Sequence, residues 1–137
     1  MSETDKIKNV EKTVNYWLTS SDDDYKAMMN LYETKNYNWA LFLGHITVEK
    51  LLKAYYVKKN ETHAPFIHDL YRLAKLCELE LTEEDANRLD KISSFNINAR
   101  YEDYKREFYT LCTDSYAEEW ITKITSLQQW IKQMLSE

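Results

Sequence analysis

The 137-residue chain contains one glycine, Gly44, one proline, Pro65, and no Asn-Gly or Asp-Gly pair. A β-rich chain of this length needs many tight turns, and glycine, proline and Asn-Gly pairs normally supply them. Their scarcity argues against a β-rich fold and favours an all-α protein. A single glycine also excludes the glycine-rich phosphate loops of P-loop and dinucleotide-binding proteins.

The sequence also lacks a long apolar run. The longest, residues 39–43, stops at Gly44, whereas a membrane-spanning helix needs about 20 apolar residues. The N-terminal segment contains no apolar stretch of the kind that a secretory signal requires. Charged residues make up 30% of the chain and aromatic residues 14%, which excludes a disordered chain. We therefore expect one soluble domain, residues 1–137, in the cytoplasm and without a membrane partner.

An excess of basic residues is missing as well. The chain has 23 acidic and 18 basic residues, which gives a formal charge of −5. Proteins that bind the nucleic-acid backbone over a large surface usually carry a basic excess, because neutralising phosphates supplies most of their affinity. Any nucleic-acid site must therefore be local. The two cysteines, Cys77 and Cys112, form no CxxC pattern and are expected to be reduced thiols in the core.

Patterns for metal binding and catalysis are scarce. The three histidines are His45, His63 and His68, and none belongs to a cluster with zinc spacing or to a recognised nucleophile pattern. No Glu stands three residues before a His, which excludes a di-iron bundle. His45 and Glu49 lie one helical turn apart, but a single pair is little evidence for a metal, and the apolar neighbours of His45 favour a structural histidine. We assign no catalytic residue, no metal and no cofactor.

Hydrophobic periodicity predicts the first two helices. Apolar residues advance in steps of three or four through roughly residues 5–35, which is typical of one long helix. Ser21 and Asp24 form an N-cap pattern inside it and leave a break near residue 20 open. After a turn at 35–38, the helix expected from Trp39 to Lys59 is apolar on almost all sides in its first half, as a central helix would be. Gly44 costs this helix about 1 kcal/mol relative to Ala, which close approach of a neighbouring helix would explain.

The second half of the chain predicts shorter elements. Residues 58–65 form the clearest loop, and apolar spacing predicts a short helix within residues 70–77. Thr82, followed by acids at 83–85, is a strong start signal for a fourth helix, because a hydroxyl caps the first turn and negative charge suits its positive end.

The last part of the chain is regular only at its end. Residues 96–113 keep a helical spacing but are less regular, and Ser115 with Glu118 forms a second capping-box pattern before a clean amphipathic stripe that reaches the C-terminus. Long helices with short connections predict an all-α, up-and-down antiparallel bundle of about four or five helices.

Charge and aromatic residues concentrate in two segments. Glu49 and Lys53 are spaced as an (i, i+4) ion pair, and Lys50 and Lys53 share a helix face that is either solvated or able to hold an anion together. Arg100 is followed by Tyr101, and an Arg beside an aromatic ring suits phosphate contact with base stacking. The same Arg equally suits an ion pair with an acid such as Glu49.

Three sets of residues together resemble the HEPN family, small helical bundles often encoded beside minimal nucleotidyltransferases. They follow one another over nearly the whole chain: Trp17, Asp24 and Ala27; residues 37–40 (YNWA) with 45–54 (HITVEKLLKA); and residues 68–70 (HDL) with 99–101 (ARY). The Glu-Lys-x-Leu-Lys-Ala block within 45–54 is the most specific part of the likeness.

The resemblance implies an up-and-down bundle, commonly a homodimer, with a role in nucleotide or RNA biology. Many relatives are ribonucleases or toxins of toxin–antitoxin pairs, and their activity rests on an Arg followed, after about four to six residues, by a His. This chain departs from that pattern, because its last histidine is His68 and its first arginine is Arg72. In similar proteins a Pro usually follows the Ala-Arg-Tyr segment, and here Glu102 places an acid near Arg100.

We therefore expect a non-enzymatic HEPN-type protein that forms a homodimer and pairs with a nucleotidyltransferase-like protein of the toxin–antitoxin type. Eleven Tyr and four Trp are many for a small bundle, and such residues are enriched at interfaces. The residues expected to hold the phosphate of a nucleotide or RNA are Lys50, Lys53, Arg100, Tyr101 and His68. The alternatives are a metal-independent endoribonuclease that uses His45 or His68 with Arg100, and a pure protein-interaction bundle.

Overall fold

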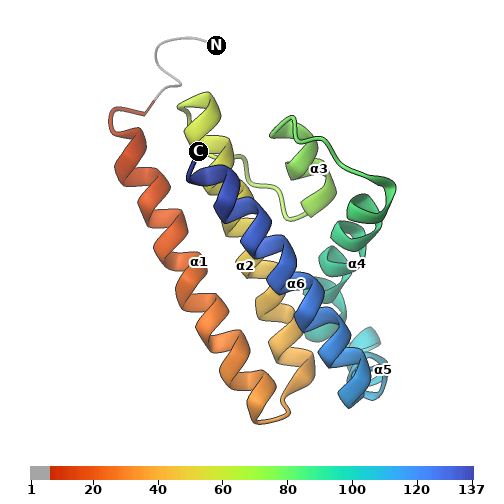
Figure 1. The fold of residues 1–137 in the computed structure, drawn as a ribbon. Helices are drawn as coiled ribbons and strands as arrows, with labels where there is room; N and C mark the ends of the chain where they lie inside the picture. The colour runs from red at the N-terminus through yellow and green to blue at the C-terminus, as the bar shows by residue number, and fades with distance from the viewer. Residues whose placement is uncertain (1–6) are drawn as a thin grey trace.

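The computed structural model describes residues 7–137, and this part of the chain forms six helices. They are α1 (Val10–Glu33), α2 (Tyr37–Asn60), α3 (Leu70–Leu76), α4 (Glu83–Arg100), α5 (Glu102–Leu111) and α6 (Asp114–Leu135). The long helices α1, α2, α4 and α6 run alternately down and up the molecule, and the short helices α3 and α5 lie near its two ends (Figure 1). The predicted all-α, up-and-down bundle is confirmed, and residues 7–137 contain six helices rather than four or five.

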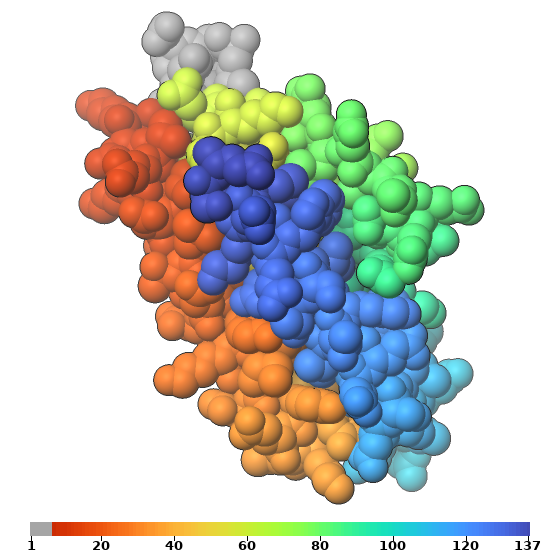
Figure 2. Space-filling view, in the orientation of Figure 1, coloured from red at the N-terminus to blue at the C-terminus, as the bar shows by residue number. Residues whose placement is uncertain are grey.

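Helix α2 is the centre of the bundle. It packs against α1, α3, α4 and α6, which explains why its first half is apolar on almost every side. The middle of α2 is hidden behind α1 and α6 in the space-filling view (Figure 2). Although α2 is the most buried helix, neither it nor any other helix within residues 7–137 is long and apolar enough to cross a membrane.

Helix α1 is continuous, so the break near residue 20 does not occur. Ser21 is fully buried, and its hydroxyl donates to the carbonyl oxygen of Thr47 in α2 at 2.8 Å. The helix begins at Val10 rather than near residue 5, because the side chain of Asn9 accepts a hydrogen bond from the amide of Lys12 and caps the first turn. Residues 5 and 6 of the predicted helix lie outside the described residues.

Helix α4 begins as the sequence predicts. Thr82 accepts a hydrogen bond from the amide of Asp85, and the Asp85 carboxylate accepts one from the amide of Thr82, which completes the capping box. The less regular region that follows, residues 96–113, contains the ends of two helices. Tyr101 adopts an extended conformation and separates α4 from α5, and α5 ends at Leu111.

The predicted cap of the last helix at Ser115 is wrong. Helix α6 begins earlier, because the hydroxyl of Thr113 accepts a hydrogen bond from the amide of Tyr116. The carboxylate of Asp114 in the first turn of α6 accepts a hydrogen bond from the hydroxyl of Tyr37 at 2.6 Å. This bond raises the pKa of Tyr37 to about 12 and joins the start of α6 to the start of α2.

The two cysteines lie in the core as free thiols. The thiol of Cys77 donates to the carbonyl oxygen of Leu52 in α2. Burial raises the pKa of Cys77 and of Cys112 to about 12, so both thiols stay protonated near neutral pH and are poor nucleophiles.

Gly44 lies where α1, α2 and α6 meet. A Cβ added at this position would stand 2.4 Å from Cδ1 of Ile124 in α6 and 3.3 Å from the sulfur of Met28 in α1. Ile124 and Met28 are fully buried, so neither can move aside without disturbing the core. The glycine therefore permits the close approach of three helices.

We predict that Gly44→Ala and Ile124→Val interact energetically. Ala favours the helix by about 1 kcal/mol, but its methyl group overpacks the core at a cost of about 1–3 kcal/mol. Ile124→Val removes the methyl group that the new Cβ would meet. In urea denaturation, Gly44→Ala should therefore be at least about 1 kcal/mol more favourable in the Ile124→Val background than in the native one. An equal effect in both backgrounds would contradict this account of Gly44.

Candidate functional site

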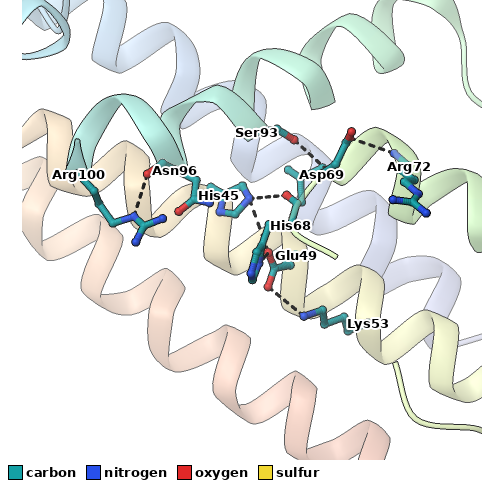
Figure 3. Close-up of polar contacts among 10 residues, drawn as sticks. His45, Glu49, Lys53, His68, Asp69, Arg72, Ser93, Asn96 and Arg100 are labelled. Atoms are coloured by element: carbon teal, nitrogen blue, oxygen red, sulfur yellow. Dashed lines mark hydrogen bonds and ion pairs between the residues drawn. The ribbon is translucent and has the colours of Figure 1, made fainter. Parts of the chain in front are cut away.

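One face of α2 carries the residues on which the site is built. Phe42, His45, Glu49 and Lys53 follow one another at intervals of three or four residues, so their side chains share a face of the helix. Polar groups from the segment after α2 and from α4 meet this face (Figure 3). The same spacing that makes α2 a central helix thus aligns four chemically different side chains.

Glu49 is a buried carboxylate with two basic partners. Its side chain is 9% exposed. One oxygen accepts a hydrogen bond from Nζ of Lys53 at 3.1 Å, and the other accepts one from Nδ1 of His68 at 2.8 Å. The contact with Lys53 confirms the predicted (i, i+4) pair. Removing a carboxylate from water is costly, and these two hydrogen bonds offset part of that cost inside the bundle.

His45 is buried beside Glu49. Burial lowers the pKa of its imidazole, against the opposing effects of its hydrogen bond to the backbone of His68 and of the charge of Glu49. Its Nε2 lies 2.9 Å from the carbonyl oxygen of His68 and must donate to it, so we assign the neutral ring with a bare Nδ1. No residue in the described part of the chain donates a hydrogen bond to Nδ1. His45 is thus a structural histidine, as expected, with one acceptor left over.

The His-Asp-Leu segment fixes the connection between α2 and α3. The carbonyl group and the ring of His68 bind His45 and Glu49 on α2. The side chain of Asp69 accepts a hydrogen bond from the amide of Arg72 and caps α3, which begins with the fully buried Leu70. The backbone of His68 is therefore held against α2, while its side chain remains 67% exposed.

The two candidate lysines are both paired. Nζ of Lys50 lies 2.6 Å from the Asp24 carboxylate in α1 and 2.6 Å from the Ser20 hydroxyl. Nζ of Lys53 binds Glu49 and lies over the ring of Trp17 in α1, 5.4 Å from the ring centre. Both lysines therefore join α2 to α1, and neither presents an uncompensated charge.

Arg100 and Tyr101 lie where α4 ends. The guanidinium of Arg100 donates through Nε to the carbonyl oxygen of Asn96 and lies over the rings of Phe42 and Tyr101, at 5.7 and 5.4 Å from their centres. Within residues 7–137, no carboxylate stands at ion-pair distance from it, so neither Glu49 nor Glu102 neutralises Arg100. Arg100 is exposed, and 54% of Tyr101 is exposed.

These groups form one cluster, which we call the Arg100–His68 cluster: Phe42, His45, His68, Arg100 and Tyr101. His45 is hydrogen-bonded to the backbone of His68, and Arg100 lies over Phe42, one turn before His45 on α2, so the two basic groups meet the same stretch of α2 (Figure 3). An anion would meet the permanently charged fork of Arg100 and the exposed ring of His68. A planar base would meet the exposed ring of Tyr101.

Sequence reasoning found Arg100, Tyr101 and His68 but missed Phe42, which supports the Arg100 guanidinium. The sequence did contain a signal for Phe42, because its spacing places it on the same helical face as His45 and Glu49. The spacing of residues along the chain does not predict that Arg100 reaches this face of α2, because α4 is distant from α2 in sequence. The contacts between α1 and α2, in contrast, join helices that are neighbours in sequence; they involve Asp24, Lys50 and Trp17.

We predict that His45 makes the protein less stable in mild acid. The pKa of His45 is lower in the folded protein than its ordinary value near 6.5, so as the pH falls below about 6.5 the unfolded chain binds a proton that the folded one does not. The free energy of unfolding should then decrease by up to about 1.4 kcal/mol per pH unit. Urea denaturation between pH 7.5 and 5 should show a weaker pH dependence for His45→Gln, whose amide can still donate to the His68 carbonyl.

The matched control is His63→Gln, the same substitution at an exposed histidine in the loop after α2. It should retain the pH dependence of the native protein. An unchanged slope for His45→Gln would mean that His45 is not the titrating group.

Comparison with known proteins agrees with this architecture. A model of the HEPN domain family matches residues 14–134, a range that includes every residue of the Arg100–His68 cluster. Searches of curated proteins and of solved structures found no match. Because the family match covers nearly the whole chain, the protein belongs to the HEPN domain family.

Proposed function

We propose that this HEPN protein is a non-enzymatic partner of a nucleotidyltransferase-like, toxin–antitoxin type protein and binds the phosphate of a nucleotide or RNA at the Arg100–His68 cluster. The observation that carries the binding site is the guanidinium of Arg100. It is exposed, lies over two aromatic rings and has no carboxylate partner among the described residues. The protein partner rests on the family resemblance of the sequence.

Within this proposal the candidate residues take different roles. Arg100 and His68 contact the phosphate, and Tyr101 stacks on the base. Lys50 and Lys53 act indirectly, because their charges already bind Asp24 and Glu49. They hold α1 and the Glu49 carboxylate in place beneath the cluster.

A second candidate function, a metal-independent endoribonuclease, is favoured by the pair that Glu49 and His68 form. The carboxylate binds Nδ1 of His68 at 2.8 Å, which leaves Nε2 as the nitrogen able to exchange a proton with a ligand. A carboxylate that orients an imidazole is a common arrangement for acid–base chemistry. The missing Arg-then-His order of the family argues for binding without cleavage.

Arg100→Ala should lower the affinity for a short oligouridylate about tenfold or more, because a charged hydrogen bond to phosphate contributes about 1.5–3 kcal/mol. Isothermal titration calorimetry with ATP, GTP and the oligonucleotide would measure this. Arg72→Ala removes an exposed arginine in α3 and should change the affinity by less than about twofold.

Two results would change the proposal. Absence of heat with all three ligands would reduce the protein to an interaction bundle. Cleavage of total tRNA by the purified protein, lost in both His68→Ala and Arg100→Ala, would replace binding with the endoribonuclease activity.

We infer that the protein forms a homodimer through the outer surface of α4 and α5. Of the nine large apolar side chains that are exposed in the described residues, five lie between positions 97 and 111. Exposed apolar residues gathered on one surface are typical of a protein interface. They are Ile97, Tyr101, Tyr104, Tyr109 and Leu111. Tyr104 and Leu111 line the same cavity, whereas Tyr109 lies on another face of α5. The interface is therefore placed at Ile97, Tyr104 and Leu111, which leaves Tyr101 able to stack on a base.

Sedimentation velocity at tens of micromolar protein, roughly the micromolar affinity range, should show a dimer. Tyr104→Glu should shift it to monomer, because a charge would be buried in the interface. Tyr16→Glu places the same charge on another exposed tyrosine, in α1, and should leave the dimer intact. A monomeric native protein would refute the inference.

A further inference from the structure

The surface along α4 is hollowed near both ends of the helix. A first cavity, of about 520 Å³, lies at the start of α4 and is lined by Lys91 of α4 and Trp120 of α6, among others. A second cavity, of about 550 Å³, lies at the end of α4 and is lined by Asn98 and by residues of α5. Helix α4 runs from one cavity to the other (Figure 1). Neither cavity is lined by a residue of the Arg100–His68 cluster.

The two cavities are connected by one face of α4. Lys91, Ser94 and Asn98 follow one another at intervals of three and four residues, so they share this face. Lys91 and Asn98 are seven residues apart, which corresponds to about 10 Å along the helix. The small residue Ser94 stands between them, and its hydroxyl already donates to the carbonyl oxygen of Lys91. A second helix can therefore approach the middle of this face without leaving that hydroxyl unpaired.

The first cavity has one uncompensated cation. Two of the three cations that line it are already paired: Arg88 binds Glu84, and Lys123 binds Glu119. Lys91 is exposed and has no ion-pair partner within residues 7–137. The remaining acid, Glu83, lies in the first turn of α4, where the positive end of the helix dipole stabilises it. This end of the surface is thus a hollow with a free positive charge at Lys91.

The second cavity carries the opposite charge. Glu107 is its only charged lining residue. Glu107 is exposed and has no ion-pair partner in the described part of the chain. Tyr104 and Leu111 line the same cavity and are each about half exposed. This end of the surface therefore presents a free carboxylate between two apolar side chains.

A surface with opposite charges at its two ends is complementary to a second copy of itself that is related by a twofold axis. We propose that α4 packs antiparallel against α4 of a second copy, with the axis near Ser94. Glu107 of each copy then binds Lys91 of the other, and Tyr104 and Leu111 of each copy pack into the first cavity of the other. A parallel arrangement would instead place like charges together. The inference rests on the proposed homodimer and adds its geometry.

Reversing one charge at a time tests this pairing. Lys91→Glu would face Glu107 of the second copy, and Glu107→Lys would face Lys91, so each variant should dimerise at least about tenfold more weakly than the native protein. An equimolar mixture of the two variants should regain the native affinity, because both ion pairs of the mixed dimer then join opposite charges. Sedimentation velocity at several protein concentrations would measure these affinities.

The matched control is Lys26→Glu, the same reversal at an exposed lysine of α1, which should leave the dimer intact. The double variant Lys91→Glu/Glu107→Lys should dimerise with itself within about threefold of the native affinity, and each variant must keep the native helical circular dichroism spectrum. Native-like dimers of both single variants, or a mixture that stays monomeric, would overturn the pairing while leaving the homodimer in place. A monomeric native protein would refute the homodimer itself.

Discussion

The pair of contacts that Glu49 makes organises this protein more than any other interaction. A carboxylate inside a helical bundle is tolerated only when cations or donors surround it, and here one partner comes from its own helix and the other from the segment that follows it. Lys53 carries the connection on to Trp17 in α1, and His68 carries it to the start of α3. The partners that compensate the charge of Glu49 thus also hold α1 and the segment before α3 against the central helix.

The helices were predictable because their signals are local. Spacing of apolar residues and the Thr82 cap depend only on neighbours in sequence, and the structure follows them. Where two caps competed, as at Thr113 and Ser115, sequence alone chose wrongly, since both hydroxyls precede an acidic first turn and only their conformations distinguish them. The α4–α5 boundary at Tyr101 lacks a proline or glycine to mark it, so the spacing suggested an irregular helix.

The site was predictable in part for the same reason. Glu49 and Lys53 pair within one helix, and spacing alone indicates that pair. The sequence allowed two roles for Arg100, a contact with an anionic ligand or an ion pair within the protein. Which of them applies depends on where the end of α4 packs. The bundle sets its guanidinium on Phe42 and near His45, although the order of Arg and His along this chain is the reverse of the usual one in the family. Sequence order therefore says little about which side chains meet across helices.

Helix α5 stands apart from this framework. The hydroxyl of Tyr37 already joins the start of α6 to the start of α2 through Asp114, so the register of the long helices is set without α5. Only Phe108 of α5 is buried within the helix. Its outward positions are accordingly under little structural constraint. Substitutions at these outward positions can therefore alter how the protein assembles while the fold is preserved.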